Sequence, residues 1–115
     1  MWPFSKRPAW RRLDESFSAG GQVRAADLPA IREAGFSMLL CLRPDGEDPG
    51  QPAFAVIADE AARLGLSAFH IPVSGMPGAQ ELAAFRAVMA GARGSVLGWC
   101  RSGARAEALW RLSRG

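Results

Sequence analysis

The sequence is poor in metal-ligating and disulfide-forming residues. Among its 115 residues there are two cysteines, Cys41 and Cys100, and a single histidine, His70. Two cysteines are too few for a disulfide framework, and a reducing compartment would keep both as thiols. One histidine, with no paired cysteine or histidine spacing, leaves a zinc ion without a ligand set. We therefore expect no metal and no cofactor.

Long apolar runs are also missing. The longest strongly apolar segment, "FSMLLCL" at residues 36–42, is far shorter than the roughly 20 residues that cross a bilayer. No apolar segment follows the basic start of the chain in the manner of a signal peptide. Apolar residues make up 49% of the chain and charged residues 22%, which is typical of a globular protein rather than a disordered one. We expect one cytoplasmic domain without a transmembrane segment.

The first 12 residues form a basic, aromatic arm. Its basic and aromatic side chains are those of Lys6, Arg7, Arg11, Arg12, Trp2, Phe4 and Trp10. Such an arm could contact nucleic acid or an anionic membrane. Because no sustained helical stripe is visible, we favour a solvated leader in which Trp10 and Leu13 dock on the core. We expect no nucleic-acid partner, and a single domain at residues 13–115.

Short apolar segments alternate with helical patterns along the rest of the chain. Strands are predicted at residues 17–23, 36–42, 66–73 and 95–100, and helices at 27–34, 54–64, 82–89 and from 103 or 104 onward. This alternation predicts an α/β fold, a three-layer sandwich with a mostly parallel sheet of four to five strands flanked by helices. The functional crevice of such a sheet lies beyond the carboxyl ends of its strands. The loops expected there are residues 43–51, 74–79 and 100–105.

The segment "WCRSGARAE" places Cys100 at the end of a strand and just before a helix. A helix N-terminus and a nearby arginine both lower the pKa of a thiol, and the thiolate is the nucleophilic form. Gly103 permits the loop to curl around the sulfur, and Arg105 can close the ring around an anion. The loop residues whose amides would hold that anion are Arg101, Ser102, Gly103, Ala104 and Arg105.

A plainer interpretation of this loop is that Cys100 ends a buried strand, Gly103 turns the chain and Arg105 is solvated. However, an arginine in the first turn of a helix opposes the helix dipole, and a bound anion explains its presence better. We therefore favour the anion-binding loop, with Arg101 adding positive potential at its rim.

Four segments together resemble a known family. In chain order they are "LDESFSAGGQV", "LRPDGEDPGQP", "FHIPV" and "WCRSGARA". They are similar to the small phosphatase-like domain of beta-lactamase hydrolase-like proteins, a family of unknown function in which this domain is fused to a partner of metallo-β-lactamase fold. The resemblance covers residues 13–112 and implies the fold of cysteine-dependent tyrosine and dual-specificity phosphatases. Since the fused partner is similar to persulfide dioxygenases, the resemblance also points to sulfur metabolism and to a persulfide dioxygenase-like protein as a partner.

The cysteine loop departs from the phosphatase pattern in its length. Cysteine phosphatases have five residues between the cysteine and the arginine, whereas four separate Cys100 from Arg105 here, and Ala106 stands where the longer loop would have its arginine. The shorter loop resembles that of rhodaneses, whose ring fits one sulfane sulfur. A smaller ring encloses three phosphoryl oxygens less fully, which disfavours phosphate.

An acid for the leaving group is also missing from its expected place. Transfer of a phosphoryl group from an alcohol needs such an acid, whereas transfer of sulfane sulfur to a thiolate does not. The loop in which dual-specificity phosphatases place that aspartate is "SGMPGA" here. Asp45, Glu47 or Asp48 could substitute from the neighbouring loop, although turn formation explains Asp45-Gly46 more simply. Arg43 is either a second anion contact or a surface residue.

The residues left over have simpler explanations. We expect His70 and Trp99 to be structural, Ser102 to be an ordinary loop serine, and Cys41 to be an inert buried thiol unless its strand end approaches Cys100.

These observations predict a rhodanese-like sulfurtransferase that takes sulfur from a small sulfane donor onto Cys100, with Arg105 stabilising the anion. One alternative is a phosphatase acting on a phosphorylated substrate through a phosphocysteine, with Asp45 as acid. Another is a non-catalytic anion-binding module.

Overall fold

A computed structural model describes residues 9–115, and its centre is a five-stranded sheet with the strand order β1-β2-β5-β3-β4. The strands are β1 (Trp10–Arg12), β2 (Phe17–Gly20), β3 (Phe36–Cys41), β4 (Ser67–His70) and β5 (Ser95–Trp99). The helices are α1 (Leu28–Glu33), α2 (Phe54–Arg63), α3 (Ala79–Ala90) and α4 (Ala104–Ser113), and a 3-10 turn (Ala25–Asp27) precedes α1. Strands β2, β5, β3 and β4 run parallel, and only β1 pairs antiparallel.

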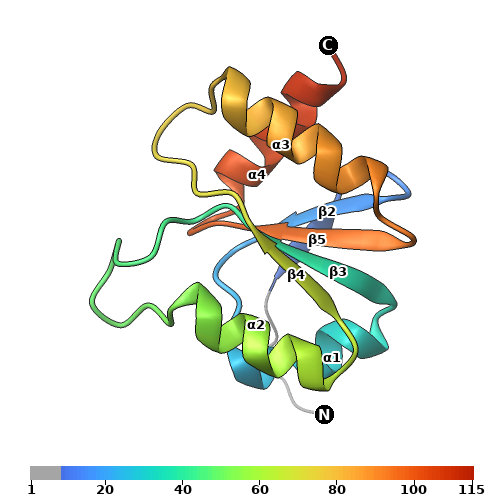
Figure 1. The fold of residues 1–115 in the computed structure, drawn as a ribbon, viewed down its shortest axis with the longest axis vertical. Coiled ribbons are helices and arrows are strands. Elements are labelled where there is room, and N and C mark those ends of the chain that lie inside the picture. Colours follow the sequence, from blue (N-terminus) through green and yellow to red (C-terminus); the bar gives the residue numbers. More distant parts are fainter. Residues whose placement is uncertain (1–8) are drawn as a thin grey trace.

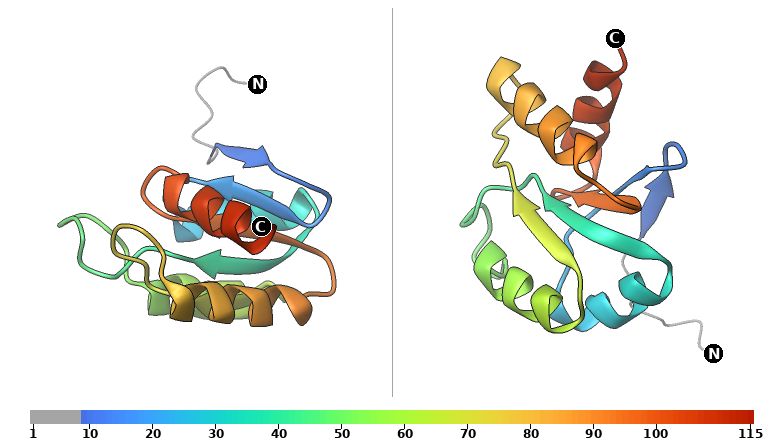
Figure 2. Two further views of the ribbon diagram at one scale, coloured as in Figure 1. Left: turned by 90° about the horizontal axis from the view of Figure 1, so that it is seen from above. Right: turned by 45° about the vertical axis from the view of Figure 1, so that its right-hand side comes forward.

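The helices cover both faces of the sheet. Helices α1 and α2 lie on one face and α3 and α4 on the other (Figure 1), and the two further views show the same three layers (Figure 2). Each parallel strand returns through a helix, so the carboxyl ends of β2, β3, β4 and β5 meet at one edge of the sheet. The predicted α/β sandwich with a mostly parallel sheet is confirmed.

Two apolar clusters, one on each face, hold the layers together. Leu40 and Phe85 belong to the cluster beneath α3 and α4, whereas Leu39 and Ile57 belong to the cluster against α1 and α2. Neighbouring residues of β3 therefore enter different cores, which explains why "FSMLLCL" is almost continuously apolar. Burial of these side chains is the main favourable contribution to folding.

All four predicted strands are longer than the observed ones, and the difference is largest for β2 and β4. Strand β2 ends at Gly20, because the chain turns there toward the 3-10 helix, although Val23 is still fully buried. Strand β4 ends at His70, yet the N–H of Val73 still bonds to the carbonyl of Leu42, 2.9 Å away. An apolar pattern records burial, and burial continues past the point where ladder pairing stops. In α4 the pattern is only partly matched by burial, because Leu109 is fully buried and Leu112 is exposed.

The described part of the N-terminal arm joins the sheet. Residues 10–12 form β1, Trp10 packs edge-on against Phe36 with ring centroids 5.2 Å apart, and Leu13 packs against the first cluster. Arg11 pairs with Glu107 of α4. Lys6, Arg7, Trp2 and Phe4 lie outside the described residues.

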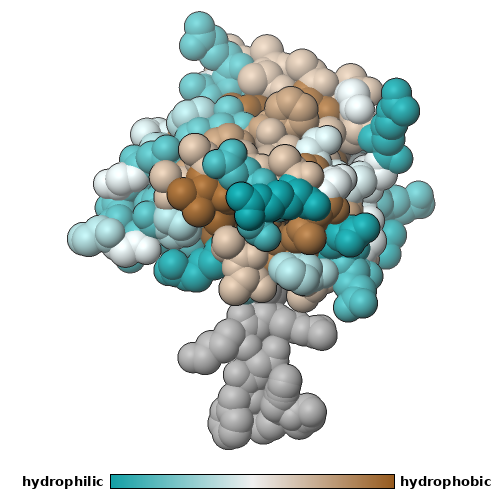
Figure 3. Space-filling view, turned by 60° about the horizontal axis from the view of Figure 1, so that its bottom comes forward, coloured by the Kyte–Doolittle hydropathy of each residue, from teal (hydrophilic) through white to brown (hydrophobic). Residues whose placement is uncertain are grey.

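One face of the molecule has mixed polarity. In Figure 3, hydrophilic side chains are interspersed with small apolar areas on the face shown. None of the helices among residues 9–115 has the length and apolar character needed to cross a bilayer.

Candidate active site

The loop after β5 turns sharply into α4. Gly103 has a φ of +98°, a conformation that residues with a side chain rarely adopt. A Cβ atom at this position would also lie 3.3 Å from the carbonyl oxygen of Gly20. The N–H of Cys100 bonds to the same carbonyl at 3.3 Å. The carbonyl of Gly20, at the end of β2, therefore contacts the cysteine loop at both Cys100 and Gly103.

The sulfur of Cys100 lies at the centre of this loop and is almost completely buried. The N–H of Gly103 is directed at Sγ at a distance of 3.1 Å. Burial raises the pKa of Cys100, but hydrogen bonds from the backbone N–H groups of Ala106, Arg105, Ser102 and Gly103 bring the pKa below its ordinary value of 9.0. These N–H groups stabilise the thiolate, so Cys100 has the electrostatic environment of a nucleophile.

The amides that face the sulfur differ from the predicted anion-binding set at two positions. The N–H of Ala104 bonds to the hydroxyl of Ser102 at 3.3 Å and not to the sulfur. The amide of Ala106, one residue beyond the predicted loop, does face the sulfur. The side chain of Arg101 is largely exposed, with its Nε 3.6 Å from the carboxylate of Asp48.

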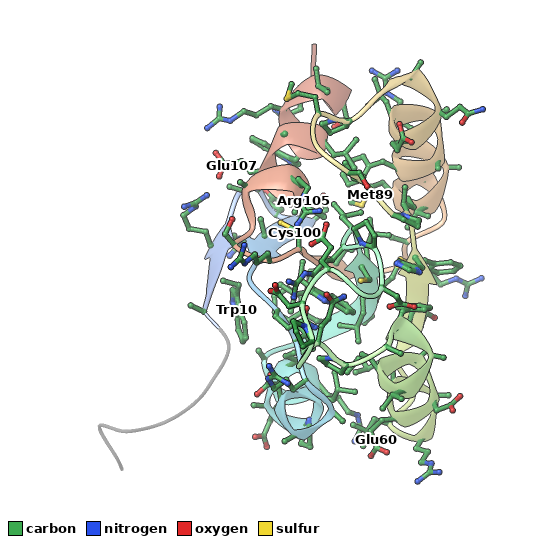
Figure 4. The ribbon with its side chains drawn as sticks, turned by 90° about the vertical axis from the view of Figure 1, so that its left-hand side faces the viewer. Trp10, Glu60, Met89, Cys100, Arg105 and Glu107 are labelled. Atoms are coloured by element: carbon green, nitrogen blue, oxygen red, sulfur yellow. The ribbon has the colours of Figure 1, made fainter. Side chains whose placement is uncertain are left out.

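Arg105 comes from the first turn of α4 and reaches across the loop edge. Its Nη1 donates to Oε2 of Glu47 and to the carbonyl of Val73, both at 2.7 Å, and its Nη2 donates to Oε1 of Glu47 at 2.9 Å. A guanidinium has five N–H groups, so Nε–H and one Nη2–H remain on a single edge. The guanidinium also contacts the sulfur of Cys100, and the two residues lie together in Figure 4. This edge can donate two parallel hydrogen bonds to an anion in the loop.

The acidic residues of the 43–51 loop are all engaged in contacts. Glu47 binds both Arg105 and Arg43, and the hydrogen bonds from these two guanidinium groups lower its pKa to about 2. Asp48 accepts a hydrogen bond from Arg43 at 2.5 Å. Asp45 accepts the backbone N–H of Phe54 at 2.8 Å and so caps the start of α2. This contact favours the structural interpretation of Asp45, and its role as a substitute acid stays a prediction.

The structure contradicts the surface interpretation of Arg43. Only 3% of this residue is exposed, so it is not a surface residue. Its guanidinium donates to Glu47, Gln22 and Asp48 at 2.9, 2.8 and 2.5 Å, and these contacts give it a structural role, whereas its role as a second anion contact stays a prediction. The long side chain and planar guanidinium of arginine let it bind three partners on two loops from one buried position.

The remaining candidates are structural. His70 places Nε2 2.9 Å from the carbonyl of Arg43 and stacks on Phe54, with centroids 4.6 Å apart. Burial raises the pKa of Cys41 to about 12, and Cys41 packs in the cluster on the opposite face of the sheet from Cys100. Trp99 is fully buried, and its Nε1 has no partner within residues 9–115.

Sequence reasoning missed three parts of the site: the amide group of Gln22, the carbonyl of Val73 and the pairing of Glu47 with Arg105. Gln22 directly follows a strand and two glycines, which is a detectable signal for a polar residue at the functional edge. A backbone carbonyl leaves no such signal. No cluster of three or more metal-ligating side chains occurs within residues 9–115.

The family model of the beta-lactamase hydrolase-like protein, phosphatase-like domain, matches residues 9–115. The chain belongs to this family. A beta-lactamase hydrolase-like protein of Agrobacterium fabrum is 37% identical over 102 residues, which cover 88% of this chain and 24% of the relative. One of Xylella fastidiosa is 34% identical, with the same coverage. The phosphatase-like domain therefore spans about a quarter of the length of these curated relatives.

Solved structures show the same fold. A protein of Neisseria meningitidis described as a "putative phosphatase" is 33% identical, has a TM-score of 0.82, and is covered over 74% of its chain by 90% of this one. Tk-PTP in its active form is 19% identical with a TM-score of 0.63, over 99% of this chain and 85% of the other. The resemblance seen in the four sequence segments is confirmed, and the fold is that of tyrosine-phosphatase-like proteins.

Proposed function

We propose that this phosphatase-like domain is a sulfurtransferase that carries sulfane sulfur on Cys100. The Cys100 thiolate attacks the outer sulfur of a donor such as thiosulfate or a persulfide. A new S–S bond forms on Cys100, the S–S bond of the donor breaks, and sulfite or a thiolate leaves with the electron pair. A thiol or cyanide then takes the outer sulfur and returns Cys100 to its thiolate form.

The observation that carries this proposal is the state of the carboxylates around the loop. Glu47 is held ionised between two arginines, Asp48 is bound to Arg43, and Asp45 caps α2. None of these carboxyl groups is placed to give a proton to a leaving oxygen. Sulfite and thiolates are stable as anions, so sulfur transfer proceeds without such a proton.

The loop also suits the intermediate. A Cys100 persulfide carries its negative charge one atom further from the β5 strand than the thiolate does. The amides of Gly103 and Arg105 and the Arg105 guanidinium all interact with the Cys100 sulfur, so they would also flank a persulfide formed there. Fixed donors of this kind stabilise an anion without having to reorganise during the reaction.

A phosphatase is the second candidate, and the comparisons favour it. The family is described as phosphatase-like, and the solved relatives include a "putative phosphatase" and a tyrosine phosphatase. In this alternative the phosphoryl group moves to Cys100 and the alcohol leaves. Without an acid, only esters with a good leaving group, such as aryl phosphates, would react at a useful rate.

One experiment separates the candidates. The wild type, Cys100→Ala and the matched control Cys41→Ala are given thiosulfate with cyanide, and separately an aryl phosphate. Intact mass is recorded after the sulfur donor alone. We expect thiocyanate release and a gain of one sulfur atom in the wild type and Cys41→Ala, and neither in Cys100→Ala.

Two other outcomes would contradict the proposal. Phosphate release that depends on Cys100, without sulfur uptake, would establish the phosphatase. If neither substrate were turned over in a Cys100-dependent way, the remaining candidate would be a non-catalytic anion-binding module.

We further propose that a persulfide dioxygenase-like protein is the partner for this sulfur. The support is the family to which the chain belongs and the greater length of its relatives. Transfer from a sulfur-loaded Cys100 to glutathione, followed by oxygen consumption when such a dioxygenase is added, tests this partner.

A further inference from the structure

Arg43 lies beneath the site and connects loops from three parts of the chain. Its Nη1 binds Gln22, which follows β2, and its Nε and Nη2 bind Glu47 and Asp48 of its own loop. Glu47 in turn binds Arg105 of the cysteine loop. Arg43 itself does not contact the anion cradle in the described contacts, and the proposed reaction assigns it no role.

A buried arginine is costly unless its charge is compensated. With 3% of the residue exposed, Arg43 depends on Glu47 and Asp48 for opposite charge and on the Gln22 amide oxygen for a further acceptor. An apolar residue would fill the same volume without that cost. The protein instead has a guanidinium with three hydrogen-bond partners, and the planar geometry of this group fixes the direction of each partner.

The partner whose direction matters most is Glu47. One of its oxygens, Oε1, accepts from Nε of Arg43 at 2.9 Å and from Nη2 of Arg105 at 2.9 Å, and its other oxygen accepts from Nη1 of Arg105 at 2.7 Å. A glutamate held only by Arg105 could swing with it. Held by Arg43 as well, Glu47 fixes the plane of the Arg105 guanidinium together with the carbonyl of Val73, so that the edge carrying Nε–H keeps one direction.

We propose that Arg43 is a positioning residue that acts through Glu47 to aim the free edge of Arg105 at the anion bound over Cys100. The amides that stabilise the Cys100 thiolate belong to the loop backbone and do not depend on Arg43. Since the main stabilisation of the thiolate comes from these amides and the Arg105 guanidinium adds a smaller part, Arg43 affects anion affinity more strongly than it affects thiolate stability. The inference deepens the proposed function, but its test requires no turnover.

The test measures alkylation of Cys100 by iodoacetamide, quantified on the Cys100 peptide, with inorganic sulfate as the protecting anion. In Arg43→Met we expect the sulfate concentration for half protection to rise about tenfold, because a guanidinium whose partner Glu47 has lost its second anchor is aimed less accurately and weakens its charge-assisted hydrogen bonds to the anion. The pH midpoint of alkylation should stay within about 0.3 units of the wild type. Arg63→Met, at an exposed arginine of α2, is the matched control and should change neither value.

A merely structural role predicts a different pattern. If the loop opened, the alkylation midpoint would rise toward that of a free thiol at the same time as protection was lost, and that result would overturn the proposal. Unchanged sulfate protection would overturn it as well. If Arg43→Met does not fold, Arg43→Lys keeps the charge but not the fork, and the same separation of the two readouts is expected.

A double-mutant cycle tests the route through Glu47. Glu47→Gln alone should weaken sulfate protection, and adding Arg43→Met to it should weaken protection by no more than about twofold further. If the loss of sulfate protection in the double variant equalled the product of the losses in the two single variants, Arg43 would not act through Glu47. Failure of sulfur transfer with these protection results intact would count against the proposed function and not against the role of Arg43.

Discussion

Glu47 and Arg105 form a two-point ion pair across the cysteine loop, with Oε2–Nη1 and Oε1–Nη2 distances of 2.7 and 2.9 Å. The residues are far apart in the chain and meet because the loops after β3 and β5 leave the same edge of the sheet. The pair uses the outer edge of the guanidinium and leaves the edge toward Cys100 available. Glu47 therefore acts as a support for the anion site rather than as its acid.

Glu47→Gln should lower the stability of the folded state near neutral pH by about 1 kcal/mol, a value discounted for the partial exposure of the pair. The folded-state pKa of Glu47 is about 2, below its ordinary 4.5. A depressed carboxyl pKa contributes stability that is fully present above the unfolded value and is lost as the pH falls toward the folded one. Chemical unfolding at several pH values should show the wild-type advantage shrinking between about pH 5 and pH 2.

Glu60→Gln, which alters an exposed contact with Arg63 at 3.7 Å, is the control for this experiment. It should change stability little at any of these pH values. An equal loss in both variants, or a Glu47→Gln deficit that persists unchanged at pH 2, would mean that the ion pair does not set the pKa of Glu47.

The two cysteines should differ sharply in their reactivity. Backbone hydrogen bonds bring the pKa of Cys100 below its ordinary value, whereas burial raises that of Cys41 to about 12. In the folded protein, Cys100 should be alkylated with a pH midpoint below that of a free thiol, while Cys41 stays unmodified. Peptide mass spectrometry after timed alkylation measures both. Denatured protein is the control, since there the two thiols should react alike, and a folded-state midpoint for Cys100 at or above the free-thiol value would contradict the loop assignment.

Gly103→Ala should damage the loop more than the fold. The positive φ of Gly103 and the carbonyl of Gly20 at 3.3 Å from an added Cβ both oppose a side chain. A strained backbone of this kind costs about 1–3 kcal/mol, and the loop can relieve it by shifting the amides away from Cys100. We expect loss of sulfur loading on Cys100, measured by intact mass, together with a higher alkylation midpoint.

Gly46→Ala is the matched control for Gly103→Ala. Gly46 also has a positive φ, of +80°, but an added Cβ there meets no atom within 4 Å. Both variants carry backbone strain, but only Gly103→Ala should raise the alkylation midpoint of Cys100. The same rise in Gly46→Ala would mean that the alkylation midpoint does not report specifically on the amides of the Gly103 loop.

The sequence was sufficient for the fold and for the centre of the site. The alternation of elements predicted the sheet, and "WCRSGARAE" predicted the placement of Cys100 between β5 and α4. The role of Arg43 could not be predicted, because nothing local shows that Gln22 and Glu47 approach the same guanidinium. Ion pairs between loops depend on side-chain directions that arise only when the sheet edge is assembled. The same limit applies to Asp45, whose partner is the N–H of Phe54, nine positions away.

Asp45→Ala separates the two candidate chemistries. The Asp45 carboxylate accepts the N–H of Phe54 at 2.8 Å at the start of α2, and loss of a helix cap costs about 1 kcal/mol. Under the proposed sulfurtransferase, turnover of thiosulfate and cyanide should stay within about twofold of the wild type when the protein is assayed well below its melting temperature. An acid catalyst at this position would instead contribute about 10²–10⁴-fold.

Asp59→Ala serves as the control, because Asp59 is exposed on α2 and makes no such contact in the described hydrogen bonds. It should leave both stability and turnover unchanged. If Asp45→Ala lost aryl phosphate hydrolysis by two orders of magnitude while Asp59→Ala kept it, Asp45 would be an acid despite its contact with Phe54. The phosphatase would then be the better account of the site. Equal turnover in the two variants, with only the stability of Asp45→Ala reduced, would show that Asp45 caps α2 and gives no proton to a substrate.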